Sequence, residues 1–279
     1  MRFLIPSLTA MLLAGLPPAQ AQTQPLNDTG ITGSGNATNA VAATCDASHP
    51  AGQDCHYGRD KAAADGALAK AGASALNNGI ANGFDFTKVC NSGQLAGQGT
   101  CPADPALGAG NDDWACTKDN VTGLVWEVKV NDSGHLRHMG HTYYWYSTDA
   151  TTNGGSPGTP GSGSSTSSGA VCAGSATDRC DTEKFVVDVN AAGLCGATDW
   201  RMPTIKELHG IADLGRASPA SAAIDPVFFP NTPMSSDYWS GTRYIGASGN
   251  AWRVDFRSGA AHNNGAEFGL SVRLVRTGP

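Results

Sequence analysis

Hydrophobic residues are spread unevenly along the chain, and their distribution divides it into an extension and a folded domain. Residues 45–113 are rich in glycine and alanine, whereas Trp, Tyr, Phe, Val and Leu become frequent from residue 114 onward. A segment with few large apolar side chains cannot form a core alone. We therefore predict a disulfide-pinned extension over residues 45–113 that lies against a domain over residues 114–279. Within the extension, residues 62–76 predict a weak helix and residues 83–90 a short strand.

Alternating hydrophobic and polar residues predict strands at both ends of the domain. TGLVWEVKV alternates Leu124, Trp126 and Val128 with the residues between them, which is typical of a half-buried strand. HTYYWYS, at residues 141–147, predicts a second, aromatic strand, and DYWSGTRYIG, NAWRVDFRSG and LSVRLVRT predict three more near the C-terminus. Residues 148–170 contain mostly Gly, Ser, Thr and Pro, so we expect a disordered surface loop there.

Two helices are predicted between these groups of strands. CDTEKFVVDVNAAGLCG has Asp181 as a candidate N-cap and Phe185 and Val189 on its inward side, with glycines near its end. In DWRMPTIKEL, Thr204 and Glu207 match a capping box that starts a second helix. Its buried side is expected to carry Ile205, Leu208 and Ala212. Pro203 sets the turn before this helix, and we expect Asp199 and Arg201 to tie that turn to the sheet.

The N-terminus has the pattern of a secretory signal peptide. Arg2 precedes the apolar run FLIPSLTAMLLAGL, and small residues stand at Ala19 and Ala21. The run is shorter than the roughly 20 apolar residues that cross a bilayer. We therefore expect residues 1–21 to be removed and residues 22–44 to form a flexible leader. The mature chain is then exported to the periplasm, the cell surface or the medium, without a membrane span.

The cysteines support an oxidising compartment. All eight follow the predicted signal peptide, their number is even, and no C-x2-C pair typical of zinc sites occurs. An even set in an exported chain is interpreted first as disulfides. Proximity along the chain favours Cys45 with Cys55, Cys90 with Cys101 and Cys172 with Cys180, which leaves Cys116 to pair with Cys195.

Charge argues against a nucleic-acid partner. The formal net charge is −6, and no block of like charge stands out. From Cys195 onward the basic residues comprise seven arginines and one lysine. Arginine forms forked contacts with carboxylate or sulfate, and it also forms buried ion pairs. Both interpretations of these arginines remain open.

Six motifs in order resemble one known family. They are NVTGLVWEVK, CDTEKFVVDVNAAGLCGATDWRMPTIKEL, IDPVFFPNT, YWSGT, AWRVDFRSG and VRLVR. Together they resemble the Lcl C-terminal domain family, named after a bacterial collagen-like adhesin, from about Trp114 to Arg276. The upstream GFDFTK resembles the lead-in of a subset of these exported proteins. The insertion at residues 148–170 and the His-rich segment before TYYWY depart from the family pattern.

The resemblance implies an α+β fold similar to C-type lectins and formylglycine-generating enzymes. Such a fold packs two helices on a small, twisted, mostly antiparallel sheet with long irregular loops. The resemblance also implies adhesion at the cell surface, including binding of sulfated polysaccharides. A fold alone does not fix function, so each candidate site depends on its own residues.

Sequence patterns of catalysis are missing. Formylglycine-generating enzymes carry a cysteine pair late in the domain, and here no cysteine follows Cys195. The H-x3-H-x-E arrangement of related iron enzymes is absent, as are G-x-S-x-G and H-E-x-x-H. We therefore predict that the chain is not an enzyme.

Metal sites are weakly indicated. HLRHMGH places His135, His138 and His141 at every third residue, and imidazole is a common ligand for zinc or copper. Flanking glycines favour a hairpin in this segment. The alternative to a metal site is therefore that the three histidines are exposed to solvent. Lectins of this fold often hold sugar through calcium, and DPVFFPN contains Asp225 and Asn231, but no D-x-D-x-D-G loop occurs. We expect no cofactor, with a structural calcium as the alternative.

Ligand binding is predicted in the last strands, because aromatic faces stack on sugar rings and arginine forks bind sulfate. The candidate residues are Tyr238, Arg243, Tyr244, Arg257, His262 and Asn263. Structural roles are predicted for Trp126, Trp200, Arg201, Pro203, Thr204, Glu207, Trp239 and Trp252. The sequence thus predicts an exported, non-catalytic domain that binds an extracellular acidic polysaccharide or surface glycoprotein. The alternatives are a structural subunit of a cell-envelope assembly and a metal-dependent enzyme that uses the three histidines.

Overall fold

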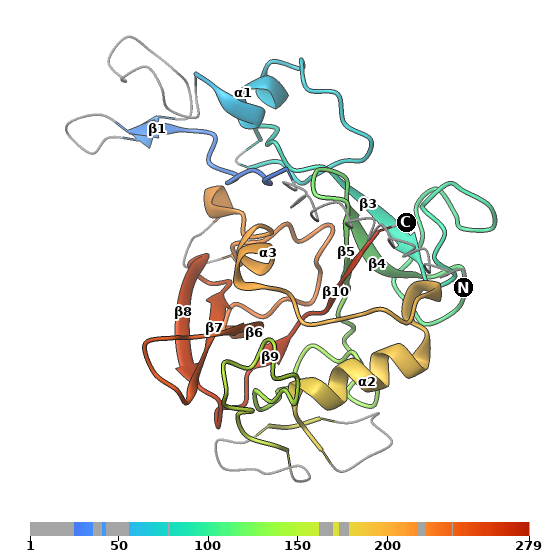
Figure 1. Cartoon of the computed structure of the whole chain (residues 1–279). Coiled ribbons are helices and arrows are strands. Elements are labelled where there is room, and N and C mark those ends of the chain that lie inside the picture. Colours follow the sequence, from blue (N-terminus) through green and yellow to red (C-terminus); the bar gives the residue numbers. More distant parts are fainter. Residues whose placement is uncertain are drawn as a thin grey trace, which may run out of the picture.

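The computed structural model describes residues 25–35, 41–42, 56–77, 79–161, 170–172, 179–216, 221–235 and 237–278. They form an α+β fold of few, short helices and three sheets (Figure 1). The helices are α1 (Gly58–Ala64), α2 (Thr182–Ala192) and α3 (Ile205–His209). The strands are β1 (Ser34–Gly35), β2 (Val41–Ala42), β3 (Phe86–Cys90), β4 (Trp114–Asp119), β5 (Leu124–Glu127), β6 (Asp237–Arg243), β7 (Asn250–Asp255), β8 (Ala260–Gly265), β9 (Ser271–Val272) and β10 (Val275–Thr277). The predicted signal peptide and the Cys45–Cys55 pair lie outside the described residues.

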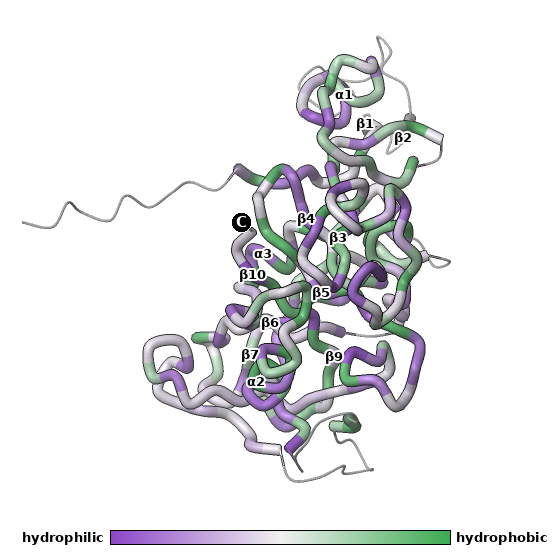
Figure 2. Tube along the Cα trace, turned by 90° about the vertical axis from the view of Figure 1, so that its right-hand side faces the viewer, coloured by the Kyte–Doolittle hydropathy of each residue, from purple (hydrophilic) through white to green (hydrophobic). Residues whose placement is uncertain are grey.

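Two four-stranded sheets make up the body. One has the order β10-β5-β4-β3 and is antiparallel throughout. The other has the order β8-β7-β6-β9, in which β9 runs parallel to β6. Only Arg273 and Leu274 separate β9 from β10, so this short segment joins the two sheets. Figure 2 shows hydrophobic segments running through the middle of the body, around β5, β6 and β9.

The two predicted helices of the domain form where their caps indicated. The Asp181 side chain accepts a hydrogen bond from the Lys184 amide and caps α2, whose inward residues Phe185 and Val189 are buried. Gly193, at φ 64°, ends this helix in the left-handed region that glycine adopts without strain. Thr204 and Glu207 form both bonds of the capping box of α3. These local predictions are confirmed.

The turn before α3 is joined to β10. Arg201 exchanges two backbone hydrogen bonds with Val275, and its guanidinium pairs with Glu207 at 2.7 Å. Asp199 pairs with Arg276 at 2.6 Å. Asp199, Arg201 and Glu207 of DWRMPTIKEL are therefore engaged in connecting α3 to the sheet.

Three of the four expected disulfides are present: Cys90–Cys101, Cys116–Cys195 and Cys172–Cys180. Cys116–Cys195 spans 79 residues and fixes β4 to the turn that follows α2. On the chain-entropy model a loop of this length stabilises the fold by about 4 to 5 kcal/mol.

Two strand predictions need correction. Residues 124–130 are buried throughout, so this strand is not half-buried as its alternation suggested. Its polar face is covered by α2, since the Lys129 Nζ lies 4.6 Å from the centre of the Phe185 ring. Residues 141–147 form isolated bridges, such as Tyr143 with Leu270 and Tyr146 with Gly158, and no strand of their own. Their partners are short loop segments that cannot continue a ladder.

The extension also differs from its prediction. The helix there is α1, and it ends before residues 65–76, where Gly66 has a φ of 70° and Ala73 bridges to Phe86. The predicted strand is confirmed as β3, and it is an edge strand of the sheet with the order β10-β5-β4-β3. The extension thus contributes a strand to the body.

Two segments expected to lack order contain described parts with defined contacts. In the leader, Thr29 accepts a hydrogen bond from the Leu214 amide, and Gly30 is buried. In the insertion, the Asn153 side chain is buried and donates to the Ser147 carbonyl. Hydrogen bonds hold both segments, since the Thr159 amide of the insertion also donates to the Trp145 carbonyl.

Candidate functional site

The structure removes two of the six predicted ligand residues from the surface. Tyr238 is fully buried and packs against Phe256, with the ring centres 5.3 Å apart. Arg243 is 8% exposed, and its guanidinium lies 4.6 Å from the centre of the Trp145 ring. Both belong to β6, which lies between β7 and β9 and is covered on both faces. The prediction that these two side chains are exposed is therefore wrong.

Two of the six, Tyr244 and Asn263, meet at one end of the second sheet. Tyr244 follows β6 and packs edge-on against Trp252 of β7, with ring centres 5.1 Å apart and an angle of 84°. Trp252 lies opposite Asn263 of β8, and the Asn263 side chain accepts a 2.8 Å hydrogen bond from that of Asn250. All four residues are partly exposed. We call Tyr244, Asn250, Trp252 and Asn263 the aromatic–amide cluster.

The last two of the six lie apart from this cluster. His262 is exposed and pairs with Arg253 in the ladder, and Arg253 forms an ion pair with Asp237. Because β-strand side chains alternate, His262 faces the side opposite to Asn263. Arg257 is exposed in the turn between β7 and β8, at the end of the hairpin remote from Asn250. The predicted set is thus divided among several places.

Exposed apolar residues stand at the same end of the sheet as the aromatic–amide cluster. Ile245, directly after Tyr244, is fully exposed, and Phe268 is 42% exposed. The Ala266 amide donates to the Gly249 carbonyl, which holds the two loops beside each other. Residues of this kind at a loop tip add contact area for a ligand or a protein.

The three histidines do not converge on one point. His138 and His141 lie ring to ring, with centres 5.0 Å apart. His135 accepts a hydrogen bond at Nδ1 from the Arg137 amide. Burial lowers the pKa of His135 and of His141. Within the described part of the chain, no group of three His, Cys, Asp or Glu could hold a metal ion.

The residues considered for calcium are engaged with the backbone. Asp225 is buried and accepts hydrogen bonds from the amides of Ala75, Val227 and Phe228. Burial raises its pKa, against these hydrogen bonds. The Asn231 side chain donates to the Lys129 carbonyl. Both side chains hold loops in place.

The predicted structural tryptophans occupy the core, with one exception. Trp126, Trp200 and Trp239 are buried, and the indoles of Trp200 and Trp239 donate to the carbonyls of Leu194 and Tyr143. Trp252 is partly exposed and packs against Tyr244 within the aromatic–amide cluster. Its role is therefore not limited to packing.

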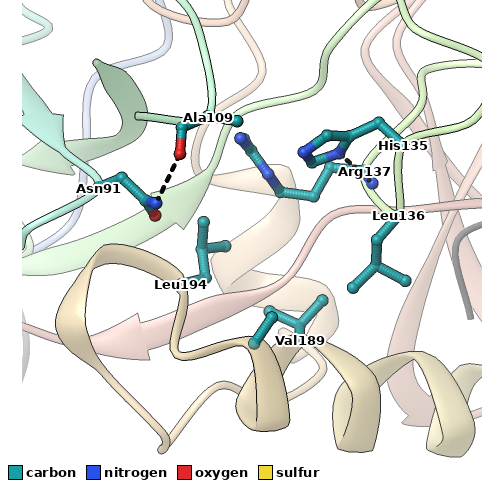
Figure 3. Close-up of a pocket in the computed structure, with 8 residues that line it drawn as sticks. Asn91, Ala109, His135, Leu136, Arg137, Val189 and Leu194 are labelled. Atoms are coloured by element: carbon teal, nitrogen blue, oxygen red, sulfur yellow. Dashed lines mark hydrogen bonds between the residues drawn. The ribbon is translucent and has the colours of Figure 1, made fainter. Parts of the chain in front are cut away.

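A pocket of about 230 Å³ lies elsewhere, between α2 and two loops (Figure 3). It is lined by Asn91, Ala109, His135, Leu136, Arg137, Val189, Ala192 and Leu194. Figure 3 shows the Arg137 side chain running across the upper part of the pocket between Ala109 and His135, with Val189 and Leu194 below. The sequence drew attention to His135 but not to Arg137, because only the fold brings α2 and residue 91 to it.

A buried cluster of cations stands behind this pocket. Lys129, Arg137 and Arg273 are buried together with one carboxylate, Glu127. Lys129 pairs with Glu127 Oε1 at 2.7 Å, and the Leu274 amide donates to Oε2 at 3.0 Å. Burial lowers the pKa of Lys129 to about 8, although Glu127 opposes this shift. Both carboxylate oxygens are thus occupied by groups other than Arg137.

Comparison with known proteins identifies one family. The profile of the Lcl C-terminal domain matches residues 115–276, which is more than half of the chain and runs from β4 to β10. The extension, with α1 and β3, precedes the match. No curated protein and no solved structure gives a significant match to the chain.

Proposed function

The chain belongs to the Lcl C-terminal domain family, and on this premise we propose that it is an exported, non-catalytic domain that binds carbohydrate. The ligand is a polysaccharide or the glycan of a surface glycoprotein. It binds at the aromatic–amide cluster, without a cofactor and without chemical change. We also propose that the domain is C-type-lectin-like, which the packing of short helices on antiparallel strands between long loops supports.

The observation that carries the proposal is the partly exposed pair of Tyr244 and Trp252 beside two asparagines. Aromatic rings provide apolar faces for the C–H groups of a sugar, and indole and phenol groups add polar edges. Asparagine side chains can donate to and accept from hydroxyl groups. Asn250 and Asn263 already bond to each other at 2.8 Å, which holds both amides in place before a ligand arrives.

Charge sets the class of sugar. Arg243 is buried, and Arg201, Arg253 and Arg276 are paired with carboxylates. The exposed basic groups on this sheet are Arg257 and His262, and neither lies within the cluster. The stacking cluster therefore suits a neutral sugar ring, while an acidic group on the same polymer would contact Arg257 or His262. Such outlying contacts weaken with salt.

The disulfides support the cellular location. Cys116–Cys195, Cys90–Cys101 and Cys172–Cys180 fit an oxidising compartment, where disulfides persist. None of the helices in the described part of the chain is long and apolar enough to cross a membrane. Export by a cleaved signal peptide remains our proposal.

A glycan array with the full chain tests the site. We expect Trp252→Ala to weaken binding of the preferred glycan by about tenfold, because a lost ring contact is worth about 1 kcal/mol or more. Trp252→Phe retains a ring and should lose less. Tyr57→Ala removes an exposed tyrosine of the extension and should leave binding unchanged.

The array also tests whether binding needs a metal ion and whether Arg257 contacts acidic groups of the glycan. Binding should survive a chelator, and Arg257→Gln should reduce the effect of salt on acidic glycans alone. Equal binding by the wild type and Trp252→Ala would exclude this cluster as the site. Absence of binding to every glycan would refute the proposed function.

A structural subunit of an envelope assembly is the second candidate, and the exposed Ile245 and Phe268 favour it. Exposed apolar side chains on two neighbouring loops are typical of protein contacts. Ile245→Ser should then abolish co-purification with a large complex and leave glycan binding intact. Unchanged co-purification together with weaker glycan binding would support the carbohydrate site instead.

A further inference from the structure

The pocket beside α2 combines an apolar floor with a buried cation. Leu136, Val189 and Leu194 provide the apolar side, and Arg137 provides the charge. Arg137 is 3% exposed. Burying an ionised group is costly unless a counter-charge compensates it. The way in which Arg137 is compensated therefore determines what the pocket can bind.

Arg137 has neutral acceptors among the described residues. Its Nη1 donates to the carbonyls of Ala115 and Val128, and its Nη2 donates to the carbonyl of Gly108 at a long 3.3 Å. A guanidinium has five N–H groups. These bonds leave Nε–H and one of the two Nη2–H groups without an acceptor in the described part of the chain. The edge of a guanidinium that carries Nε–H also carries one Nη2–H, and such an edge matches the two oxygens of a carboxylate.

No carboxylate of the described residues pairs with this edge. Glu127 is the nearby acid, and its oxygens are taken by Lys129 and the Leu274 amide. Arg273 adds a further buried cation, whose Nη1 donates to the Glu127 carbonyl. Burial lowers the pKa of Arg137, and Glu127 opposes that shift. The cluster therefore holds three basic side chains for one acid.

Two further donors border the pocket. The His135 Nδ1 accepts from the Arg137 amide, so the neutral ring carries its proton on Nε2. The Asn91 side chain donates to the Ala109 carbonyl at 3.2 Å and retains a second N–H on the same nitrogen. Figure 3 shows Asn91 and His135 on opposite sides of the pocket, with the Arg137 side chain between them.

We propose that this pocket binds a carboxylate carried on a short aliphatic group. The carboxylate pairs with the free edge of Arg137, and the aliphatic part packs on Leu136, Val189 and Leu194. A volume of about 230 Å³ accommodates a small acid or the last residue of a peptide. This site is separate from the aromatic–amide cluster, and either can fail without the other.

Calorimetric titration of the full chain with pentanoate tests the charge and the apolar requirement. Pentanamide has the same shape without the charge, and sulfate has charge without an apolar body. We expect both to bind about tenfold more weakly than pentanoate. Equal binding of pentanoate and pentanamide, or of pentanoate and sulfate, would overturn the proposal, as would absence of pentanoate binding.

Ala192 gives a variant that blocks the pocket without touching Arg137. It is exposed at the end of α2 and lines the pocket, so Ala192→Phe should fill the mouth and lower pentanoate affinity by about tenfold. The neighbouring Ala191 is equally exposed and does not line the pocket, so Ala191→Phe should change affinity less than about twofold. Unchanged affinity in Ala192→Phe would place the bound acid elsewhere.

A second variant and a second ligand complete the test. Arg137→Gln should abolish the preference for pentanoate over pentanamide; if it does not fold, the Ala192→Phe and Ala191→Phe pair decides. The tripeptide Gly-Gly-Leu presents the same chemistry as a chain terminus. Tighter binding of pentanoate assigns a free acid, tighter binding of the tripeptide assigns a peptide end, and failure of both refutes the site.

Discussion

Buried charge is handled differently in the extension interface and beside the pocket. Around the extension, five carboxylates are buried; they are Asp60, Asp85, Asp119, Asp213 and Asp225. Asp85, for example, accepts from the amides of Ala71 and Gly72 at 2.9 and 2.7 Å. Beside the pocket, three buried basic groups share the single carboxylate of Glu127.

The difference shows how a segment without a core can still pack against a domain. Every residue except proline carries a backbone N–H, so a Gly/Ala-rich chain can satisfy a buried acid with no side chain at all. A buried carboxylate with several such donors keeps its hydrogen bonds. Beside the pocket, Arg137 donates to three carbonyl groups, which accept only part of its hydrogen bonds and do not neutralise its charge. The buried acids around the extension find their hydrogen-bond donors within the chain, whereas Arg137 beside the pocket can still pair with an anion.

Removing the acid beside the pocket should have the largest effect. Glu127→Gln leaves Lys129, Arg137 and Arg273 buried without a negative partner, so we expect a loss of about 3 to 5 kcal/mol in the free energy of unfolding. Urea denaturation measures it. Glu267→Gln alters an exposed acid and should change stability by less than about 0.5 kcal/mol. Equal losses in both variants would contradict our description of the cluster.

Crowding the contact between the leader and Asp213 should have the next largest effect. Gly30 has a φ of 75°, and a Cβ atom there would stand 2.0 Å from Asp213 Oδ1, so Gly30→Ala should weaken docking by about 2 kcal/mol. Exchange of the Leu214 amide, which donates to Thr29, should accelerate by about 30-fold. Gly79→Ala is the control, because Gly79 has a φ of 81° but no atom near the added Cβ. This variant therefore measures the effect of backbone strain without crowding. Unchanged exchange of Leu214 would show that this contact does not hold the leader.

Titration of Asp213 should have the smallest effect. Burial raises the pKa of Asp213 to about 7, opposed by the Asn77 hydrogen bond and by Arg216, while Asp225 adds to the rise. The folded state then keeps a proton that the unfolded state loses near pH 4, so this contribution falls as pH rises from about 4 to 7. Asp213→Asn cannot titrate and should gain about 1 to 2 kcal/mol relative to wild type between pH 4 and pH 8. Denaturation at both pH values measures the change; parallel profiles would refute it.

Much of the fold was predictable because its signals are local. Thr204 and Glu207 are three residues apart, so the hydrogen bonds of the capping box depend on that turn alone. The pairs Cys90–Cys101 and Cys172–Cys180 are close in sequence, and the pairing of Cys116 with Cys195 followed from them together with the predicted Cys45–Cys55 pair. The strand β8 was missed because AAHNNG lacks the branched and aromatic residues that favour strands.

The candidate site was only partly predictable. Tyr244 and Asn263 were identified from residue type, and the hairpin register then placed them beside Trp252 and Asn250. Tyr238 was predicted to be exposed for the same reason, yet it is buried, with its ring packed against Phe256 and the Arg273 guanidinium. Arg137 had no sequence signal of its own, since its neighbours in space come from residues 91, 109 and 189.

The sequence by itself determined the family, the caps of α2 and α3, and the disulfide pairs of the described chain, because each depends on residue order or short spacing. The tertiary structure decided which polar residues are buried and which charges have partners. Glu127 and Lys129 alternate with apolar residues as an exposed face would, and only the packing of α2 on that face buries them. Burial and charge pairing are sums over distant segments, and no local pattern contains them.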